Sequence, residues 1–570
     1  MVKQTKISDL KPATRTDDTK SSPAAEIVPL DARVRPGAVP NPAVAAGAAP
    51  EPASGGIDMR SWMRDLEIAG LLRRVKAEVD WDEEIGALAR INLALGGPAL
   101  LFESIKDHHK TLCTRLMTCG MATRAHVLAM VGLPGDTSDK ALVRHFKEVY
   151  RAPIKPRLVE TGAVKQNILK GSEIDLGEVP VPKWHASDGG RYIDTYCGVV
   201  TKDPETGCSN VGLYRGMIVG RNRIAKLIIP TQGWGAHFGK HQGSAGKMPV
   251  AVVHGWHDAL PFCAGSPFTK QVEEWDMIGA ILGRPVELVK CETVDLEVPA
   301  DAEIVVEGYI DPNPETFEME GPFAEYPGHA AYKASPKPVM EVTCLSHRDD
   351  PIYRCALEGA RPGFPSEDSP LCAYSWSAIA WNMLEDFGVD NVMDVWMPPV
   401  VTGTNIVVQI RKRYRGHAQQ VANALWGTSA GQWFFKNVMV VEEDVDIRDR
   451  EALDWAMAFR VDAGGGQLLT FGPTFGSVLD PSMPPELANP AAYGSGSWTR
   501  LLIDATRNWE FQRDPELGGR RIPALNTIEP KLEQRIRERW TEFAIGIPYL
   551  DEAAREMLTL EQLRKVFPDA

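Results

Sequence analysis

Three carboxylates stand within eight residues of this sequence, in the stretch Glu318-Met-Glu320-Gly-Pro-Phe-Ala-Glu325. Glycine at position 321 admits unusual backbone dihedrals and proline at 322 removes a backbone donor, which predicts a strand end running into a shaped loop. Carboxylates held close together raise one another's pKa, so that one stays protonated near neutral pH and can donate a proton. A charged surface turn would have the same composition, because structural charge clusters are common. The stretch alone leaves both interpretations open.

A second candidate stretch lies about a hundred residues earlier, Ser209-Asn210-Val-Gly212-Leu213-Tyr-Arg215. The asparagine offers an oxygen ligand, and the arginine offers a fork that suits a carboxylate. Within one strand, positions 210 and 215 differ by an odd number, so the two side chains would face opposite sides unless the strand twists or bulges. An arginine at a sheet edge would explain the same pattern. Spacing by itself therefore only suggests a binding site.

The length of 570 residues exceeds what one core usually supports, so two or three domains are expected. A net charge of −14 argues against nucleic acid or an anionic membrane as the main partner. Nine cysteines are spread singly with no CxxC pair, which is typical of reduced thiols in a cytoplasmic protein. No run of 18 apolar residues and no signal-peptide region is present, so no membrane span is predicted.

Changes in composition along the chain predict four segments. Residues 1–55 contain no aromatic residue and are expected to form a disordered or loosely draped tail. Residues 56–165 alternate helical stretches with short apolar runs, which indicates a small α/β domain. Residues 166–348 are rich in strand-like runs and predict a barrel or a strongly curled sheet. Residues 349–570 return to alternation and predict a second, larger α/β domain.

Several elements can be placed more closely. Asp58 is a predicted helix N-cap, with Trp62, Leu66 and Ile68 on the buried face of its helix. A hairpin is expected from strands at 210–219 and 223–229 around a tight polar turn. Further strands are predicted at 249–254, 286–291, 304–310, 339–345, 405–410 and 438–442, and helices at 272–282, 416–426 and 450–460.

Taken together, the motifs resemble those of the UbiD family of reversible, non-oxidative decarboxylases, which use prenylated FMN. The resemblance rests on Asn210 to Arg215, on Glu320 to Glu325, and on the runs 279–283 and 289–299 between them. It extends upstream to the Asp58-Met-Arg-Ser-Trp opening and downstream to 414–418 and 504–507, and so covers roughly residues 58–545. Several ordered motifs at matching separations are a far stronger signal than any one of them.

The resemblance implies an α/β (α+β) multidomain fold. It comprises an N-terminal α/β domain, a central split β-barrel of the flavin-reductase type that holds the cofactor, and a C-terminal α/β domain that mediates dimerisation. The active site would lie in the cleft between the barrel and the C-terminal domain, where pockets with moving walls are common. A homodimer or higher homo-oligomer is expected, together with a flavin prenyltransferase that supplies the cofactor.

The resemblance also implies a role for each matching residue. Arg215 would meet the substrate carboxylate, Glu320 would pair with it, and Glu325 would deliver a proton to carbon after carbon dioxide leaves. Asn210 and Glu274 would bind a divalent cation, usually Mn²⁺, that bridges to the cofactor phosphate; K⁺ is a further candidate ion. The remaining positions expected around the cofactor are Thr195, Gly212, Leu213, Arg215, Gln232, Gly265, Ser266 and Pro267. For Thr195 and Gln232, an ordinary capping role stays open.

The sequence departs from the family pattern at one position. The family has a histidine directly after the position of Gln232 as its third metal ligand, whereas this chain has Gly233, with a histidine only at 237. Either His237 reaches back from the next turn, or Gln232 or a water completes the shell. Oxygen ligands would suit Mn²⁺ or Mg²⁺, so the loss of an imidazole does not abolish the site.

The expected function is reversible decarboxylation of an aromatic or α,β-unsaturated carboxylic acid, with carbon dioxide as the second product. The run from Tyr214 to Arg223 is closer to the hydroxybenzoate branch than to the cinnamate branch. A non-catalytic or partner-dependent subunit of a larger carboxylase assembly is the alternative, favoured by the altered metal ligands. The retention of Arg215, Glu320 and Glu325 together counts against it, because a scaffold needs no proton relay.

Overall fold

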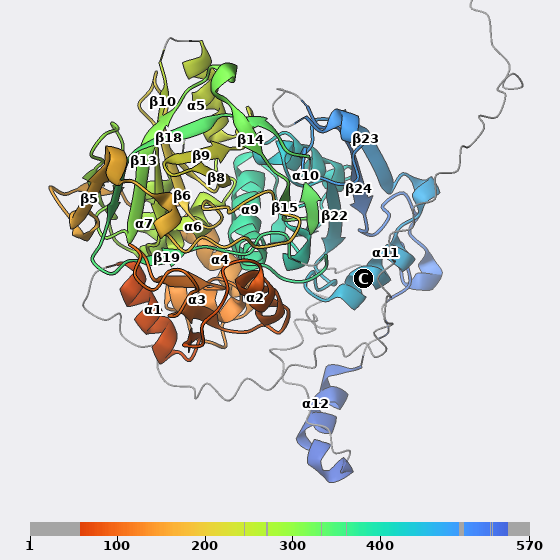
Figure 1. Cartoon of the computed structure of the whole chain (residues 1–570). Coiled ribbons are helices and arrows are strands. Elements are labelled where there is room, and N and C mark those ends of the chain that lie inside the picture. The colour runs from red at the N-terminus through yellow and green to blue at the C-terminus, as the bar shows by residue number, and fades with distance from the viewer. Residues whose placement is uncertain are drawn as a thin grey trace, which may run out of the picture. The chain divides into compact units, whose positions relative to one another are not determined.

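The computed structural model describes residues 57–243, 246–269, 272–331, 333–360, 362–489, 495–524, 526 and 528–544. The tail expected over residues 1–55 lies outside them. Figure 1 traces the N-terminal helices in red and orange, the central strands in yellow and green, and the C-terminal sheet in teal and blue. Among the described residues, no helix is both long and apolar enough to cross a membrane.

The N-terminal part combines helices with a four-stranded sheet of order β1-β2-β3-β19. The strands are β1 Leu72–Val75, β2 Ala99–Phe102, β3 Arg115–Thr118 and β19 Ile352–Arg354, and the helices are α1 Met59–Ile68, α2 Glu84–Ala94, α3 Arg124–Val131 and α4 Asp139–Val149. The predicted cap is present, since Asp58 and Ser61 form a capping box. Trp62 and Leu66 are buried, but Ile68 is 69% exposed, and the prediction for Ile68 was wrong. Two residues beyond Leu66 correspond to about 200° around a helix, which turns the side chain away from the core.

The central part is one large sheet of order β7-β6-β10-β13-β18-β9-β8, with β5 paired to β18. Its strands are β5 Asn167–Lys170, β6 Gly198–Lys202, β7 Ser209–Gly212, β8 Gly216–Gly220, β9 Arg223–Lys226, β10 Met248–His254, β13 Ile304–Ile310 and β18 Val339–His347. The pairs along this order are antiparallel, and β8 and β9 form the predicted hairpin.

The run 210–219, expected as one strand, is two strands that lie at opposite ends of this sheet. Residues 213–215 join them, and four Cα steps span at most about 14 Å. The sheet therefore curls until its two edges approach each other. No hydrogen-bonded ladder between β7 and β8 closes it among the described residues, so the split-barrel detail is not confirmed.

Helices and short strands surround this sheet. The helices are α5 Gly233–Gln242, α6 Ala259–Ala264 and α7 Glu274–Leu282. The short strands are β4 Arg157–Leu158, β11 Glu287–Lys290 and β12 Glu297–Pro299 in one sheet, β14 Glu318–Glu320 with β17 Ser335–Lys337, and β15 Phe323–Glu325 with β16 His329–Ala331. The carboxylate stretch is thus a strand end and a strand start on either side of Gly321-Pro322, as predicted.

The C-terminal part is a five-stranded sheet of order β20-β21-β22-β24-β23, parallel in its middle and antiparallel at both edges. Its strands are β20 Val392–Trp396, β21 Asn405–Ile410, β22 Asn437–Glu442, β23 Leu468–Thr474 and β24 Trp498–Asp504. The helices are α8 Asp368–Pro370, α9 Ser377–Asp386, α10 His417–Trp426, α11 Arg450–Arg460 and α12 Pro530–Glu538. A π-helical segment, Leu371–Trp376, joins α8 to α9 without a break.

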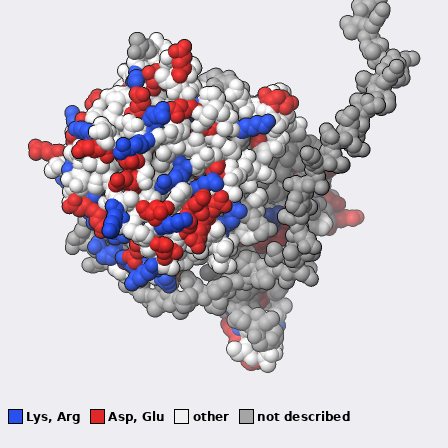
Figure 2. All heavy atoms as spheres, in the orientation of Figure 1, with Lys and Arg blue, Asp and Glu red and all other residues white. Residues whose placement is uncertain are grey.

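One hydrophobic core runs through these parts, with Met59, Val253 and Val438 in the same cluster of buried side chains. The charged surface is mixed: Figure 2 shows acidic and basic side chains interspersed over the described part of the face in view. All nine cysteines are unpaired, in line with the expectation of reduced thiols.

Candidate active site

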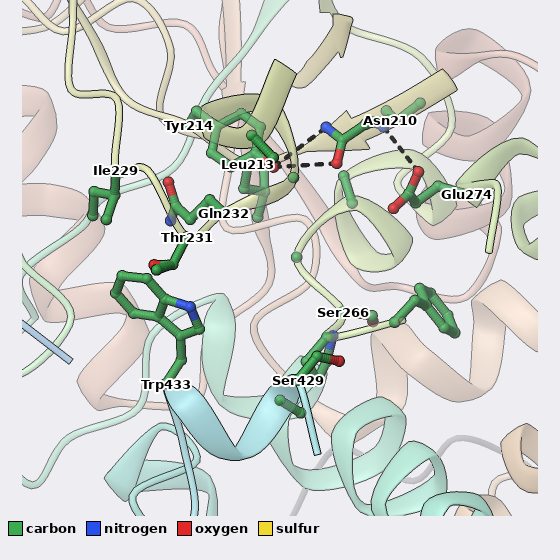
Figure 3. Close-up of a pocket in the computed structure, with 18 of the residues that line it drawn as sticks. Asn210, Leu213, Tyr214, Ile229, Thr231, Gln232, Ser266, Glu274, Ser429 and Trp433 are labelled. Carbon is green, nitrogen blue, oxygen red and sulfur yellow. Dashed lines mark hydrogen bonds between the residues drawn. The ribbon is translucent and has the colours of Figure 1, made fainter. Parts of the chain in front are cut away.

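A cavity of about 810 Å³ opens beside β7 and the segment that joins it to β8. The predicted residues that line it are Thr195, Asn210, Leu213, Arg215, Gln232, His237, Gly265, Ser266, Pro267, Glu274 and Glu325. Gly212 and Glu320 do not line it: Gly212 packs against the ring of Tyr214, and Glu320 lies buried behind Arg215. Figure 3 shows Asn210 and Glu274 on one side of this cavity and Ser429 and Trp433, from the C-terminal part, on the other.

Arg215 joins the two stretches that the sequence marks. Its Nη2 donates to Glu320 Oε2 at 3.0 Å and its Nε lies 2.9 Å from Glu320 Oε1, while Nη1 donates to Glu325. All three side chains are almost entirely buried, at 8%, 1% and 10% exposed for Arg215, Glu320 and Glu325. The third carboxylate, Glu318, pairs with Arg223 away from this group. The parity argument for Asn210 and Arg215 does not apply, because β7 ends at Gly212 and Arg215 follows outside it.

Tyr192 fixes the side of this group that faces away from the cavity. Its hydroxyl lies 2.9 Å from Glu320 Oε1 and 3.2 Å from the carbonyl oxygen of Pro322, and its ring packs on Phe323 with ring centroids 4.3 Å apart. Glu320 therefore accepts hydrogen bonds from both Arg215 and Tyr192. These contacts hold the Glu320 carboxyl group where it can orient the arginine.

Glu325 sits in a different environment. Burial raises its pKa above the ordinary glutamate value, against the opposing effect of Arg215. Burial also disfavours the charge of Arg215, but Glu325 and Glu320 together raise the pKa of the guanidinium. The arrangement places a carboxyl group that protonates readily at the cavity wall and an oriented cation beside it, as acid catalysis on a carboxylate substrate requires.

Asn210 and Glu274 meet from separate elements, β7 and the first turn of α7. The Glu274 carboxylate accepts from the Val211 amide at 2.9 Å, and Asn210 Nδ2 donates to the Tyr214 hydroxyl at 3.3 Å, both drawn in Figure 3. Burial raises the pKa of Glu274 to about 7, and no basic side chain among the described residues forms an ion pair with it. A buried carboxylate and an amide side chain that line one cavity, with no ion-pair partner for the carboxylate among the described residues, offer oxygen ligands of the kind that a divalent cation binds.

The position of the missing histidine is tightly packed. A Cβ at Gly233 would lie 1.9 Å from Asn210 Oδ1, so a side chain there would displace this amide. His237, one turn further along α5, lines the cavity and its Nδ1 lies 3.0 Å from Thr201 Oγ1. Gln232 Oε1 accepts from Trp234 Nε1 at 3.4 Å, and Thr195 Oγ1 accepts from the Ala356 amide at 3.1 Å. Gln232 and Thr195 therefore accept hydrogen bonds from other protein groups and also line the cavity.

A separate cluster of Asp194, Cys197 and His254 lies in the sheet core with its ligand atoms close enough for a metal ion. The ammonium of Lys226 already pairs with Asp194 there, and His254 Nε2 lies 3.2 Å from the same carboxylate. The cation at this cluster is therefore the lysine itself.

Two buried hydroxyls test whether the cavity fits a flavin cofactor. Within the described residues, Thr231 Oγ1 and Ser429 Oγ have no hydrogen-bond partner, and both residues line the cavity. Buried polar atoms are normally satisfied, so these hydroxyls point to a polar ligand. The volume is also within the range of small-molecule sites. The polar lining and the volume of the cavity fit a flavin nucleotide.

Sequence reasoning missed several residues of this site. Tyr192 carries no motif of its own, and Ser429 and Trp433 lie more than a hundred residues beyond the later marked stretch and more than two hundred beyond the earlier one. Two further carboxylates, Glu358 and Asp368, also line the cavity. The nearest signal was the acidic pair Glu367-Asp368, which by itself is indistinguishable from a surface turn.

Three family models match consecutive parts of the chain, all of the 3-octaprenyl-4-hydroxybenzoate carboxy-lyase: its N-terminal domain over 63–146, its Rift-related domain over 157–361 and its C-terminal domain over 371–505. An uncharacterised protein from Aquifex aeolicus is 32% identical over 509 residues, covering 86% of this chain and 99% of that protein.

Two solved structures share the fold. The UbiD-class enzyme HmfF from Pelotomaculum thermopropionicum, in complex with FMN, is 30% identical with a TM-score of 0.69, covering 84% of this chain and 98% of that one. The closed form of vanillic acid decarboxylase from Sedimentibacter hydroxybenzoicus is 29% identical with a TM-score of 0.76, covering 86% and 100%. Family models that follow one another in order, and a relative matched over nearly its whole length, show that this chain belongs to the UbiD family of carboxy-lyases.

Proposed function

We propose that this chain is a reversible, non-oxidative decarboxylase of an aromatic or α,β-unsaturated carboxylic acid, of the hydroxybenzoate type, that uses prenylated FMN and a divalent cation. The observation that carries the proposal is the single guanidinium of Arg215 in contact with both Glu320 and Glu325 at the wall of the cavity. The solved relative HmfF supports the cofactor, because it has been solved with FMN and, in an evolved dimeric form, with prFMN.

Each residue has a task that its surroundings suit. The bound flavin would supply the electron sink that an aryl or vinyl carbon lacks when carbon dioxide leaves. Arg215 would orient the substrate carboxylate, since a planar fork binds it through two hydrogen bonds. Glu320, held by Tyr192, would keep that fork in place. Glu325 would hold a proton and transfer it to the carbon, in the raised-pKa state that burial favours.

The cofactor and its cation have candidate holders. Asn210 and Glu274 would bind Mn²⁺ or Mg²⁺, with His237, Gln232 or water as the third ligand. The hydroxyls of Thr231 and Ser429 would bind polar groups of the flavin nucleotide, because both are buried without a partner among the described residues. Gly265, Ser266 and Pro267 line the same space.

We also infer that the protein is cytoplasmic and that its first two domains span residues 56–165 and 166–348. The third domain, residues 349–570, would form the interface of a homodimer or higher homo-oligomer. Large apolar side chains are exposed on this part, including Phe459 on α11 at 76% and Phe471 on β23 at 57%. A partner chain packed on this part would cover these side chains. Light scattering coupled to size exclusion measures the assembly; a monomer at micromolar concentration would contradict it.

The test is production together with a flavin prenyltransferase, followed by native mass spectrometry and an absorption spectrum of the purified protein. Prenylated FMN and one divalent cation are expected, and Asn210→Ala should lower the retention of both. The holoprotein is then offered benzoic, cinnamic and heteroaromatic acids. Release of carbon dioxide supports the proposal. A cofactor-loaded protein that is silent on all of them, but gains activity on addition of a partner chain, would favour the scaffold alternative.

A further inference from the structure

The cavity carries a second carboxyl pair that the proton transfer does not use. Glu358 and Asp368 both line it, and each lies close enough to affect the pKa of the other. Neither is among the residues that contact Arg215. The pair lies on a loop that follows β19 and on the first turn of α8, respectively.

Glu358 is held close to Glu325 by the packing of its loop. A Cβ on the next residue, Gly359, would lie 2.4 Å from the Cβ of Ala324, the residue before Glu325. The carbonyl oxygen of Glu358 lies 2.7 Å from Nε2 of His185, and Arg90 donates to the Gly359 carbonyl at 3.3 Å. The backbone here is therefore anchored on both sides, which leaves the Glu358 side chain facing the cavity.

Asp368 is held by its neighbour. The Glu367 carboxylate points into the protein, where it accepts from the amides of Cys119 and Met121 at 2.8 and 2.9 Å and pairs with the buried Arg354. Glu367 is 1% exposed, so this turn is fixed from inside. Asp368 begins α8 directly beyond it and presents its carboxyl group to the cavity.

Two carboxyl groups on the wall of one buried cavity favour a state with a single shared proton, because two nearby charges out of water repel strongly. In agreement, burial raises the pKa of Asp368 to about 6 and the pKa of Glu358 well above its usual value. A pair with one shared proton keeps a net negative charge and spare acceptor oxygens. It can accept a hydrogen bond from a hydroxyl or ring N–H, and it repels a carboxylate.

We propose that Glu358 and Asp368 form the substrate-recognition pair of this enzyme: they bind a hydrogen-bond-donating substituent, a phenolic hydroxyl or a ring N–H, on the aromatic acid whose carboxylate meets Arg215, and they exclude dicarboxylic acids. The inference rests on the proposed decarboxylation and names the substrate class for it. Unlike Glu325, the two residues act on specificity and do not donate the proton to carbon.

The experiment compares pairs of acids that differ only in whether a substituent or ring atom can donate a hydrogen bond. Holoprotein is titrated by calorimetry and assayed for kcat/KM with 3- and 4-hydroxybenzoate, the matching methoxybenzoates, pyrrole-2-carboxylate, furan-2-carboxylate and terephthalate. The wild type is expected to favour the donor-bearing acid of a matched pair by about 10- to 100-fold, the range for one hydrogen bond to a charged group. Terephthalate is expected to be rejected.

The variants are Glu358→Gln and Asp368→Asn, singly and together, with Glu341→Gln, an exposed carboxylate that pairs with Lys247, as control. The double variant should lose most of the donor preference and admit terephthalate, whereas Glu341→Gln should keep both the wild-type preference and the wild-type turnover. Equal treatment of both members of every pair by wild type and variants overturns the inference and leaves the decarboxylation standing. If no acid turns over, the decarboxylation fails, and the calorimetric ratio between matched acids still decides whether the pair recognises a donor.

Discussion

Arg215 shows how one side chain can serve two carboxylates with different tasks. Glu320 receives hydrogen bonds from Tyr192 as well as Arg215, whereas Glu325 lies at the cavity wall with Arg215 as its charged partner. Environment separates the two: two donor side chains hold Glu320 in place, whereas burial raises the pKa of Glu325 above its ordinary value. Their roles are thus assigned by their hydrogen-bond partners, since both are glutamates.

Glu325→Gln tests the role of proton donor. The amide keeps the size and the hydrogen bonding but has no proton to give at useful rates, so turnover should fall by roughly 10² to 10⁴-fold, the usual contribution of general acid catalysis. Cofactor retention should not change. Exchange of deuterium into the carbon that loses carbon dioxide should slow in parallel. Wild-type turnover by this variant would remove Glu325 from the mechanism.

Arg215→Lys tests whether the planar guanidinium group of Arg215 is required. A lysine keeps the charge but can bind neither the substrate carboxylate nor Glu320 through two parallel hydrogen bonds. A loss of roughly tenfold to a hundredfold in kcat/KM is expected from the weaker contact. Steady-state kinetics with the best substrate of the panel measure it, and an unchanged kcat/KM would show that charge alone suffices.

Asp368→Asn tests the shared proton through stability. The pKa of Asp368 is raised to about 6 in the folded protein, from an ordinary value of 3.8, chiefly by burial. Between about pH 4 and pH 6, the folded state therefore binds a proton that the unfolded state has released. The stability that comes with the protonated Asp368 is fully present below about pH 4 and is lost as the pH rises through about 6. The difference in free energy of unfolding, wild type minus Asp368→Asn, should fall across that window in urea titrations. A difference that rises with pH would contradict the shared proton.

At the scale of elements, the site depends on how strands end. β7 stops at Gly212, β14 stops at Glu320 and β15 begins at Phe323, so Arg215, Glu320 and Glu325 lie at or just beyond strand ends. α5 and α7 supply Gly233 and Glu274 from their first turns. Strand and helix ends carry such side chains because regular hydrogen bonding stops there and the backbone is free to approach a ligand.

Gly233→Ala tests the close approach of α5 to Asn210. The added Cβ would meet Asn210 Oδ1 and push the amide out of place, so retention of the divalent cation and of the flavin should fall together. Gly239→Ala is the matched control, since it lies in the same helix with nothing within 4 Å of the added Cβ. The control should be neutral or slightly stabilising. Metal analysis by mass spectrometry of both variants reports the result; equal retention would show that Asn210 relaxes without loss.

On the scale of the whole molecule, the cavity is lined by segments that lie far apart in the chain. A chain of short hydrogen bonds runs from the hydroxyl of Tyr150, the C-cap of α4, to Ser375 Oγ at 2.6 Å and on to Ser266 Oγ at 2.6 Å. It connects the N-terminal helices, the π-helical segment before α9 and the loop that lines the cavity. These buried contacts couple the three parts of the fold in one core.

Removal of residues 1–50 tests whether the rest of the chain folds and functions without this segment. A segment without a single aromatic residue offers little to bury, so folding and turnover should be nearly unchanged. Chemical denaturation of the full chain and the truncated chain gives the comparison. A loss above about 1 kcal/mol, the typical cost of removing a real contact, would show that the tail packs on the body.

The sequence by itself determined the chemistry of the marked stretches and most regular elements. Arg215, Glu320 and Glu325 carry recognisable neighbours, and the runs at 304–310, 405–410 and 450–460 follow local periodicity, which depends only on nearby residues. Tertiary structure alone decided that the run 210–219 divides between two edges of one sheet, that Tyr192 holds Glu320, and that Glu358 meets Asp368 in the cavity. These outcomes arise from contacts between segments distant in sequence, whose geometry is set by the packing of the whole core and leaves no periodic or local signal.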